Sequence, residues 1–156
     1  MYLYLVQHAE AKPKEEDPDR HLSDRGRKTA ERIASYLSQN IDIRLHSILH
    51  SDKTRALETA QVMGQKLNPI RGLEEAKELG PTSTPWGWVE RLSQLANDIM
   101  IVGHLPHLQR LSSLLLCQDE HKKILEFEKG CVICLSKDGS GVWAVQWMLT
   151  PSVIPA

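Results

Sequence analysis

Three short apolar runs in this sequence each end beside a histidine: His8, His50 and His104. If the three runs form neighbouring parallel strands, their carboxyl ends share one edge of a sheet, and the histidines converge there. Arg55 follows the second run by a few residues, near the start of a predicted helix, so its side chain can reach the same edge. The sequence therefore predicts a cluster of imidazoles with one guanidinium.

Such a cluster suits a tetrahedral dianion such as a phosphoryl group. Arginine binds phosphate through two parallel N–H bonds, and helix N-termini at the same edge add backbone donors. Histidine can donate a proton, accept one, or attack phosphorus directly. Neighbouring cations lower the pKa of a histidine and keep it neutral, as a nucleophile must be. The alternative is that these are ordinary loop histidines, because the chain contains seven of them.

Metal binding is a competing interpretation. The pair His104 and His107 matches a metal-ligand spacing only in part. Cys131 and Cys134 have C-x-x-C spacing, but they lie in an apolar run and no second pair completes a zinc site. We therefore expect two core thiols, no metal and no cofactor.

The apolar runs predict strands at these positions: 2–6, 48–49, 70–71, 99–102, 131–135 and 142–148. The last two flank a glycine-containing turn at 137–141, which is typical of a hairpin. Amphipathic spacing predicts helices between the earlier strands. This alternation favours an α/β fold: a single domain with a mostly parallel sheet, helices on both faces and an antiparallel C-terminal edge hairpin.

Four helices are expected. Ser23 can cap the first, and Ser51 or Asp52 can cap the second, which Pro69 closes. The third is predicted over about 86–95, and the fourth over 105–115, with a proline in its first turn.

Size and charge limit the classes of function. A chain of 156 residues predicts one domain over 1–156. Its net charge of −1 provides no overall field for nucleic acid or an anionic membrane, so neither is expected as a partner. Three cysteines are an odd number, and the N-terminal apolar run is too short for a signal peptide. We therefore expect a cytoplasmic protein.

Four blocks of the sequence resemble motifs of one family: residues 5–11, 22–26, 51–59 and 102–106. They match in turn a strand followed by Arg-His-Gly, a Leu-Ser/Thr block with a glycine opening a helix, a Ser-x-x-x-Arg-Ala-x-x-Thr helix start, and a strand followed by a small residue and His-x-Pro. The chain thus resembles the histidine phosphatase superfamily, specifically its small SixA-type phosphohistidine phosphatases. The resemblance extends from Tyr2 to Pro151.

This resemblance implies a phosphoglycerate-mutase-like fold and a role for each matched residue. His8 would attack phosphorus and become a transient phosphohistidine, Arg55 would clamp the phosphoryl oxygens, and His104 would stabilise the transition state. Ser51 would contact the ligand or cap its helix. The implied partner is a phosphorylated protein with a phosphohistidine-bearing domain, with a small phosphate ester as the alternative.

Two residues depart from the family pattern. Gln7 stands where the family has arginine, and Ala9 where it has glycine. A glutamine amide can bind phosphate but carries no charge, and loss of such a clamp costs about 2–4 kcal/mol of transition-state binding. The alternative function is therefore a catalytically weak phosphate- or phosphoprotein-binding module. Four cations could replace the lost charge: Lys12, Arg20, Arg25 and Lys53.

The general acid is not identified by any motif. Glu10, two residues after the candidate nucleophile, is the nearest carboxylate, and an ordinary loop carboxylate is the alternative interpretation. A phosphohistidine leaving group needs little acid assistance if its own ring nitrogen is protonated. The segment 81–88 is short, which predicts an open site that suits a folded protein substrate.

Overall fold

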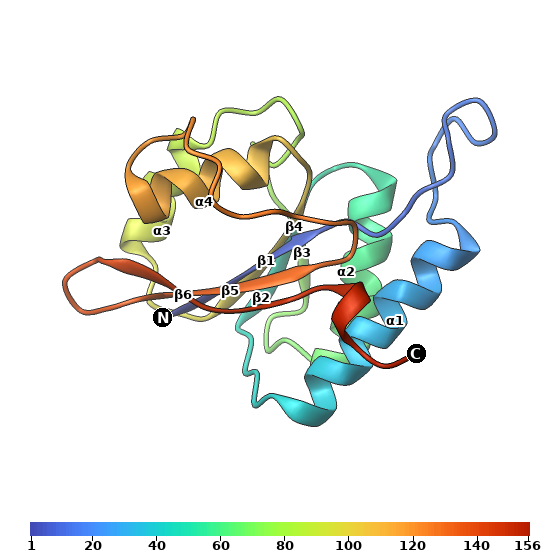
Figure 1. Ribbon diagram of the computed structural model, residues 1–156, viewed down its shortest axis with the longest axis horizontal. Helices are drawn as coiled ribbons and strands as arrows, with labels where there is room; N and C mark the ends of the chain where they lie inside the picture. Colours follow the sequence, from blue (N-terminus) through green and yellow to red (C-terminus); the bar gives the residue numbers. More distant parts are fainter.

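The computed structural model describes every residue from 1 to 156 and contains six strands and four helices (Figure 1). In chain order the elements are β1 (Tyr2–Gln7), α1 (Asp24–Asn40), β2 (Ser47–His50), α2 (Thr54–Leu67), β3 (Leu73–Glu75), α3 (Trp86–Gln94), β4 (Ile99–Gly103), α4 (His107–Cys117), β5 (Val132–Lys137) and β6 (Trp143–Leu149). A short 3₁₀ turn follows at Pro151–Val153.

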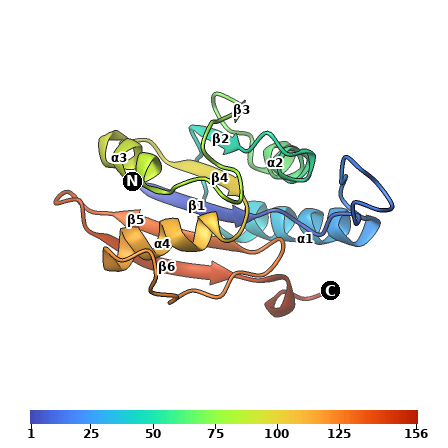
Figure 2. The same cartoon turned by 90° about the horizontal axis from the view of Figure 1, so that it is seen from above.

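The strands form one sheet in the order β3-β2-β4-β1-β5-β6 (Figure 2). The first four are mutually parallel, while β5 and β6 run antiparallel at the far edge. Leu5 of β1 and Leu49 of β2 both lie opposite Ile101 of β4, so the three strands are in register. The predicted fold class, a mostly parallel sheet with an antiparallel C-terminal hairpin, is confirmed.

Helices cover both faces of the sheet. On one face, α1 and α2 pack over a core of 21 buried residues that includes Val6, Ile33 and Met63. On the other face, α3 and α4 pack over a core of 16 residues that includes Leu5 and Leu111. Consecutive β1 residues point to opposite faces, which is why a continuous apolar run is needed. None of the helices is long and apolar enough to cross a membrane.

The prediction of a strand at 70–71 is wrong, because the third strand is β3 at Leu73–Glu75. Gly72 has a positive φ of 72° and its N–H donates to Pro69, which makes a turn there. Only glycine adopts this backbone region freely. Pairing with β2 therefore begins after the turn, where Ile48 lies opposite Leu73.

The Ser23 cap is confirmed, whereas the cap predicted for the second helix is wrong. The Ser23 hydroxyl accepts a hydrogen bond from Gly26 N at 3.0 Å. Helix α2 instead begins after Lys53, whose side chain makes no cap bond, and the Ser51 hydroxyl is bound elsewhere. Helix α4 also begins later than expected, at His107, after a cis Leu105–Pro106 peptide.

The first turn of α1 lies directly against the backbone that follows β1. A Cβ atom added to Gly26 would stand 2.0 Å from the carbonyl oxygen of Glu10. Ser23 N donates to the same oxygen at 3.0 Å. The absence of a side chain at position 26 therefore sets how closely α1 approaches the end of β1.

Replacement Gly26→Ala is expected to destabilise the protein by about 3 kcal/mol or more, since the clash is with backbone that cannot rotate away. Helix propensity alone predicts the opposite sign, a gain of about 1 kcal/mol. Urea unfolding followed by circular dichroism measures the difference. Gly139→Ala is the matched control, because no heavy atom lies within 4 Å of its added Cβ. A stabilised Gly26→Ala variant would show that this close approach is not a constraint.

Candidate active site

The carboxyl ends of β1, β2 and β4 bring the predicted residues to one edge of the sheet. His8 directly follows β1, and its N–H donates to Gly103 O of β4 at 3.1 Å. Ser51 directly follows β2, and its N–H donates to Val102 O at 3.3 Å. These two backbone bonds continue the parallel pairing one residue beyond β1 and β2. The residues that follow the strands, His8 and Ser51, are therefore held at the same edge of the sheet.

His8, Arg55 and His104 meet at this edge. The two imidazole ring centroids are 5.0 Å apart, and the rings are tilted by 56°. Arg55 Nε lies 3.3 Å from His8 Nε2 and donates to it. His8 is 6% exposed and His104 is 1% exposed, so both rings lie just below the surface. The structure thus brings together the three side chains to which the sequence assigned phosphate chemistry.

One hydrogen bond fixes the tautomer of His8. Its Nδ1 lies 2.7 Å from the carbonyl oxygen of Ala9, which can only accept. The ring proton is therefore on Nδ1, and Nε2 carries the lone pair. That lone pair faces the guanidinium of Arg55, where an anion would be held. This is the arrangement required of a nitrogen nucleophile.

Burial keeps the histidines of this region neutral. Burial, with the charge of Arg55 as a smaller cause, lowers the pKa of His8 to about 4. It also lowers the pKa of His104 to about 3, with the neighbouring His8 as the next cause. His107, completely buried at the start of α4, has its pKa lowered to about 4, chiefly by burial.

Ser51 orients the second imidazole. Its hydroxyl oxygen is 2.6 Å from His104 Nε2 and also accepts from Lys53 N at 3.3 Å. The hydroxyl proton or the imidazole proton can complete the Ser51–His104 bond, and both arrangements hold the ring in place. Nδ1 of His104 is buried without a protein partner. Ser51 therefore positions His104 and does not cap α2.

Thr59 connects the loop after β1 to α2. Its hydroxyl donates to Arg55 O at 2.8 Å and accepts from Ala9 N at 3.0 Å. Ala9, the residue whose carbonyl sets the His8 tautomer, is thereby tied through its N–H to the helical turn that carries Arg55. Thr59 belongs to the third motif block, but no pattern in that block indicates this double contact.

Gln7 and Glu10, the two remaining candidates, occupy different surroundings. Gln7 is 7% exposed, and its Oε1 is buried without a partner. Glu10 accepts from the Ser23 hydroxyl at 2.8 Å and pairs with Arg25 at 2.6 Å. The Ser23 bond is the main cause that lowers the pKa of Glu10, which disfavours it as a proton donor.

The third strand-end histidine does not join the other two. Nδ1 of His50 lies 2.9 Å from Ser51 O, and the ring makes no hydrogen bond to either of the other imidazoles. It therefore has no assigned part in the cluster, although its strand-end position is as predicted.

Comparison with known proteins agrees with this geometry. A model of the histidine phosphatase superfamily (branch 1) matches residues 3–81, just over half of the chain. The chain belongs to the histidine phosphatase superfamily. No curated protein matches its sequence.

Solved structures of histidine phosphatases share its fold. The protein histidine phosphatase SixA complexed with tungstate is 22% identical, with coverage of 97% of this chain and 98% of that one and a TM-score of 0.86. A candidate phosphohistidine phosphatase SixA from Agrobacterium tumefaciens is 24% identical, with 96% and 97% coverage and a TM-score of 0.77. The alpha-ribazole phosphatase from Shigella flexneri is 16% identical, with coverage of 97% of each chain and a TM-score of 0.76.

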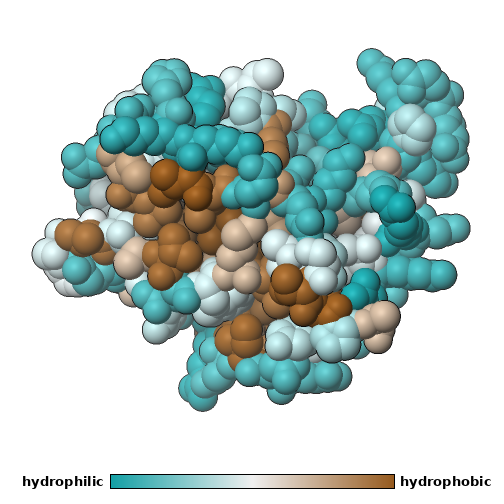
Figure 3. Space-filling model, in the orientation of Figure 1, coloured by the Kyte–Doolittle hydropathy of each residue, from teal (hydrophilic) through white to brown (hydrophobic).

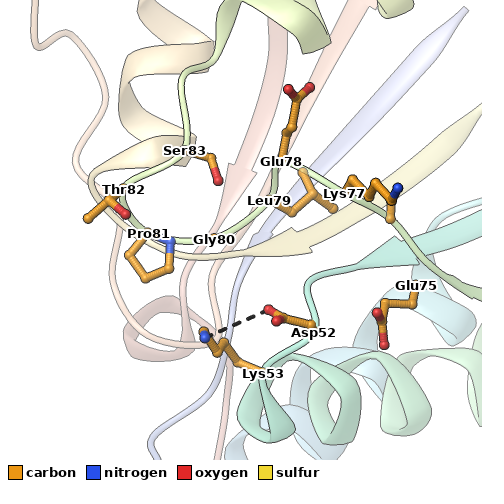
Figure 4. Close-up of a pocket in the computed structure, with 11 residues that line it drawn as sticks. Asp52, Lys53, Glu75, Lys77, Glu78, Leu79, Gly80, Pro81, Thr82 and Ser83 are labelled. Carbon is orange, nitrogen blue, oxygen red and sulfur yellow. Dashed lines mark ion pairs between the residues drawn. The ribbon is translucent and has the colours of Figure 1, made fainter.

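Two clefts lie beside the residues that flank the candidate site. One, of about 420 Å³, lies between Asp52-Lys53 and the segment 75–83, with the Asp52–Lys53 ion pair on its wall (Figure 4). The other, of about 750 Å³, begins at Glu10 and includes Arg20 and Lys129. The projecting loop between β1 and α1, which borders the second cleft, is covered with hydrophilic side chains (Figure 3). Both clefts are therefore polar and suit a hydrophilic substrate surface.

Sequence reasoning missed one cation in the cleft beside the candidate site. Lys129 precedes β5 in a segment without regular structure, and no motif marks it. Of the cations proposed from sequence, Arg25 is paired with Glu10, and Lys53 lies 3.9 Å from Asp52. Arg20 donates through Nε to Lys12 O at 3.1 Å.

Replacement Thr59→Val should lower both stability and turnover. It removes the only acceptor of Ala9 N–H, and a buried donor without a partner costs about 1–3 kcal/mol. The freed Ala9 peptide also loosens the His8 ring, so kcat is expected to fall by roughly tenfold or more. Chemical unfolding and steady-state kinetics measure the two effects. Thr59→Ser keeps the hydroxyl, and equal losses in both variants would contradict the role of the hydrogen bond.

Lowering the pH should destabilise the protein at pH values well above those at which carboxylates take up protons. Unfolded histidines take up protons below about pH 6.5, whereas folded His8, His104 and His107 stay neutral to about pH 4, 3 and 4. Stability from these depressed values is complete above about pH 6.5 and is lost as pH falls, by up to roughly 4 kcal/mol per pH unit for three protons.

The exposed His21–Asp17 pair acts in the opposite direction, because its bond to Asp17 raises the pKa of His21, but solvent screens it. Urea unfolding between about pH 7 and about pH 5 measures the proton difference. His107→Leu should reduce that slope by one proton. An unfolding free energy that does not change over this range would contradict the neutral state of the buried histidines.

Proposed function

We propose that this chain is a phosphohistidine phosphatase with His8 as its nucleophile. The observation that carries the proposal is the orientation of one lone pair. Nδ1–H of His8 is bound to Ala9 O, so the lone pair of neutral Nε2 faces Arg55. A neutral imidazole beside a guanidinium can attack a phosphorus atom that the guanidinium holds.

In the first step, the Nε2 lone pair of His8 attacks phosphorus, and the bond from phosphorus to the leaving nitrogen breaks. The electron pair of that bond goes to the leaving nitrogen. Arg55 binds the phosphoryl oxygens through its N–H groups, and an N–H of His104 donates to another oxygen as charge shifts in the transition state. The His8 ring becomes cationic when Nε2 is phosphorylated, and the Ala9 carbonyl stabilises that charge through Nδ1–H.

In the second step, a water oxygen attacks the phosphorus of phosphorylated His8, and the bond from phosphorus to Nε2 breaks. The electron pair of that bond returns to Nε2, and both protons of the attacking water leave with the phosphorus as dihydrogen phosphate. Nδ1 keeps its proton, which stays hydrogen-bonded to Ala9 O in both steps, so the ring returns to its starting tautomer. His8 is thus the attacking group in the first step and the leaving group in the second, and its Nδ1–H stays bound to Ala9 O in both.

The substrate that we propose is phosphohistidine in a partner protein. Three observations support it: the similarity to structures named histidine phosphatase and phosphohistidine phosphatase, the polar clefts on either side of the site, and Glu10, which is held by Ser23 and Arg25. A phosphoramidate whose leaving imidazole is protonated departs as a neutral ring, so the reaction does not require a protein carboxylic acid.

A second candidate, a phosphate- or phosphoprotein-binding module with weak turnover, is favoured by one observation. Gln7 is buried at the end of β1, brings no charge, and leaves its Oε1 without a partner. Its amide can donate to a bound phosphoryl group without the charge assistance of an arginine. Binding without fast turnover would follow.

The two candidates differ in whether His8 becomes phosphorylated. Incubation with a protein labelled on histidine by ³²P should transfer acid-labile label to His8, and His8→Ala should abolish both labelling and phosphate release. His21→Ala, at an exposed histidine outside the cluster, is the control and should leave both unchanged. Faster hydrolysis of p-nitrophenyl phosphate than of the phosphoprotein would favour a small-ester phosphatase. Label bound without covalent transfer would favour the binding module.

The charge missing at position 7 can be tested directly. Gln7→Arg is expected to raise kcat/KM, and by as much as roughly 30- to 1000-fold where no other cation supplies the charge, the equivalent of about 2–4 kcal/mol for one charged clamp. Gln7→Lys separates charge from bidentate geometry and should gain less. If wild type is inactive on both substrates and only Gln7→Arg is active, the natural chain is a binding module. No gain in either variant would show that charge is already sufficient at the site.

A further inference from the structure

The loop between α4 and β5 brings Lys129 to the end of β1. Gly130 N donates to the backbone carbonyl of Gln7 at 3.0 Å. Cys131 N donates to Glu128 O at 3.0 Å, which closes a tight turn around these residues. Gly130 has a positive φ of 82°, and an added Cβ there would meet Thr29 at 3.2 Å, so the turn is closely packed. The position of the Lys129 backbone relative to Gln7 is therefore fixed.

The Lys129 side chain is a free cation at the site. It is exposed, it makes no ion pair, and it lines the same cleft as Glu10 and Arg20. Its charge reaches the nucleophile: after burial and Arg55, Lys129 is the next group that lowers the pKa of His8. An ammonium on a flexible four-carbon stem can move toward a bound anion without repacking its surroundings.

We propose that Lys129 binds the phosphoryl group and supplies the positive charge that Gln7 does not carry. The inference rests on the proposed function, because it concerns the same anion. The glutamine amide would donate one neutral hydrogen bond from the strand end, and the ammonium would donate a charged one from the adjoining loop. Together, the Gln7 amide and the Lys129 ammonium would form a divided donor pair that takes the place of a single arginine.

The other cations near the site are less suited to this role. Arg25 is neutralised by Glu10, and Lys53 stands beside Asp52 on the wall of the other cleft. Arg20 and Lys12 make no ion pair, but both lie in the projecting loop between β1 and α1, where Arg20 Nε donates to Lys12 O, and neither has its backbone bound to Gln7. Lys129 alone combines a fixed backbone next to Gln7 with a side chain that has no competing partner.

The test compares Lys129→Gln, Lys129→Arg and the control Lys122→Gln in the full chain. Lys122 is exposed in the same loop, makes no ion pair and lines neither cleft beside the site. Tungstate binding by calorimetry and kcat/KM on the phosphoprotein are measured for each. Lys129→Gln should weaken tungstate binding and lower kcat/KM by roughly 10- to 100-fold, while Lys129→Arg should stay within about threefold of wild type.

A double-mutant cycle then ties Lys129 to Gln7. In the Gln7→Arg background, Lys129→Gln should cost less than about threefold, because the restored guanidinium already provides the charge. Salt dependence gives a second readout: the tungstate affinity of Lys129→Gln should fall less steeply with ionic strength than that of wild type.

The outcomes separate this inference from the function on which it rests. An active wild type with Lys129→Gln equal to Lys122→Gln in binding and turnover overturns the role of Lys129 alone. If Lys129→Gln lowers kcat/KM by the same factor with and without Gln7→Arg, Lys129 does not supply the charge that position 7 lacks. A wild type that neither turns over phosphoprotein nor binds tungstate overturns the proposed function, and this inference with it.

Discussion

The hydrogen bond between His8 Nδ1 and the Ala9 carbonyl decides what the site can do, because it determines which nitrogen carries the lone pair. That carbonyl is not free to turn. Its peptide is preceded by a strand locked between β4 and β5, and the Ala9 N–H is bound by Thr59. Since Thr59 also bonds the Arg55 carbonyl, one buried side chain links the backbone beside His8, the proposed nucleophile, to the helical turn of Arg55, the proposed anion clamp. The fold therefore fixes relative orientation as well as proximity.

A neutral histidine at neutral pH is obtained here at a cost in solvation. Burial is the largest cause that depresses the pKa of His8 and His104, and His104 leaves Nδ1 without a partner. Two apolar cores, one on each face of the sheet, offset such costs. At position 7 the desolvation cost has to be weighed against the strength of anion binding. A buried guanidinium would bind an anion strongly but would need compensation when the site is empty, whereas an amide needs less and an exposed lysine almost none. Dividing the donors between the Gln7 amide and the Lys129 ammonium thus weakens anion binding but lowers the desolvation cost of folding.

Patterns in the sequence were sufficient for features set by local periodicity. The strand ends that carry His8 and His104 follow from apolar runs and from the shared direction of parallel strands, and Ser23 caps α1 because its hydroxyl reaches Gly26 N. Features set by distant contacts were not predictable. The Ser51 hydroxyl had two plausible uses, and the choice depends on His104, which is 53 positions away. The turn that carries Lys129 lies beside the end of β1 because Gly130 N–H bonds the Gln7 carbonyl. Neither contact leaves a periodic or compositional signal.

The chemistry of the leaving group follows from where the carboxylates lie. An ester oxygen departs as an alkoxide unless a nearby acid protonates it, so ester hydrolysis at this site needs a carboxyl group with a raised pKa. Glu10, the carboxylate nearest to His8 in sequence, has its pKa lowered by Ser23 and Arg25. Asp52 stands beside Lys53 in the other cleft. A phosphoramidate nitrogen has no such need, because a protonated imidazole leaves neutral. In the proposed reaction, the lowered pKa of Glu10 therefore suits a substrate with phosphorus bonded to nitrogen better than an ester.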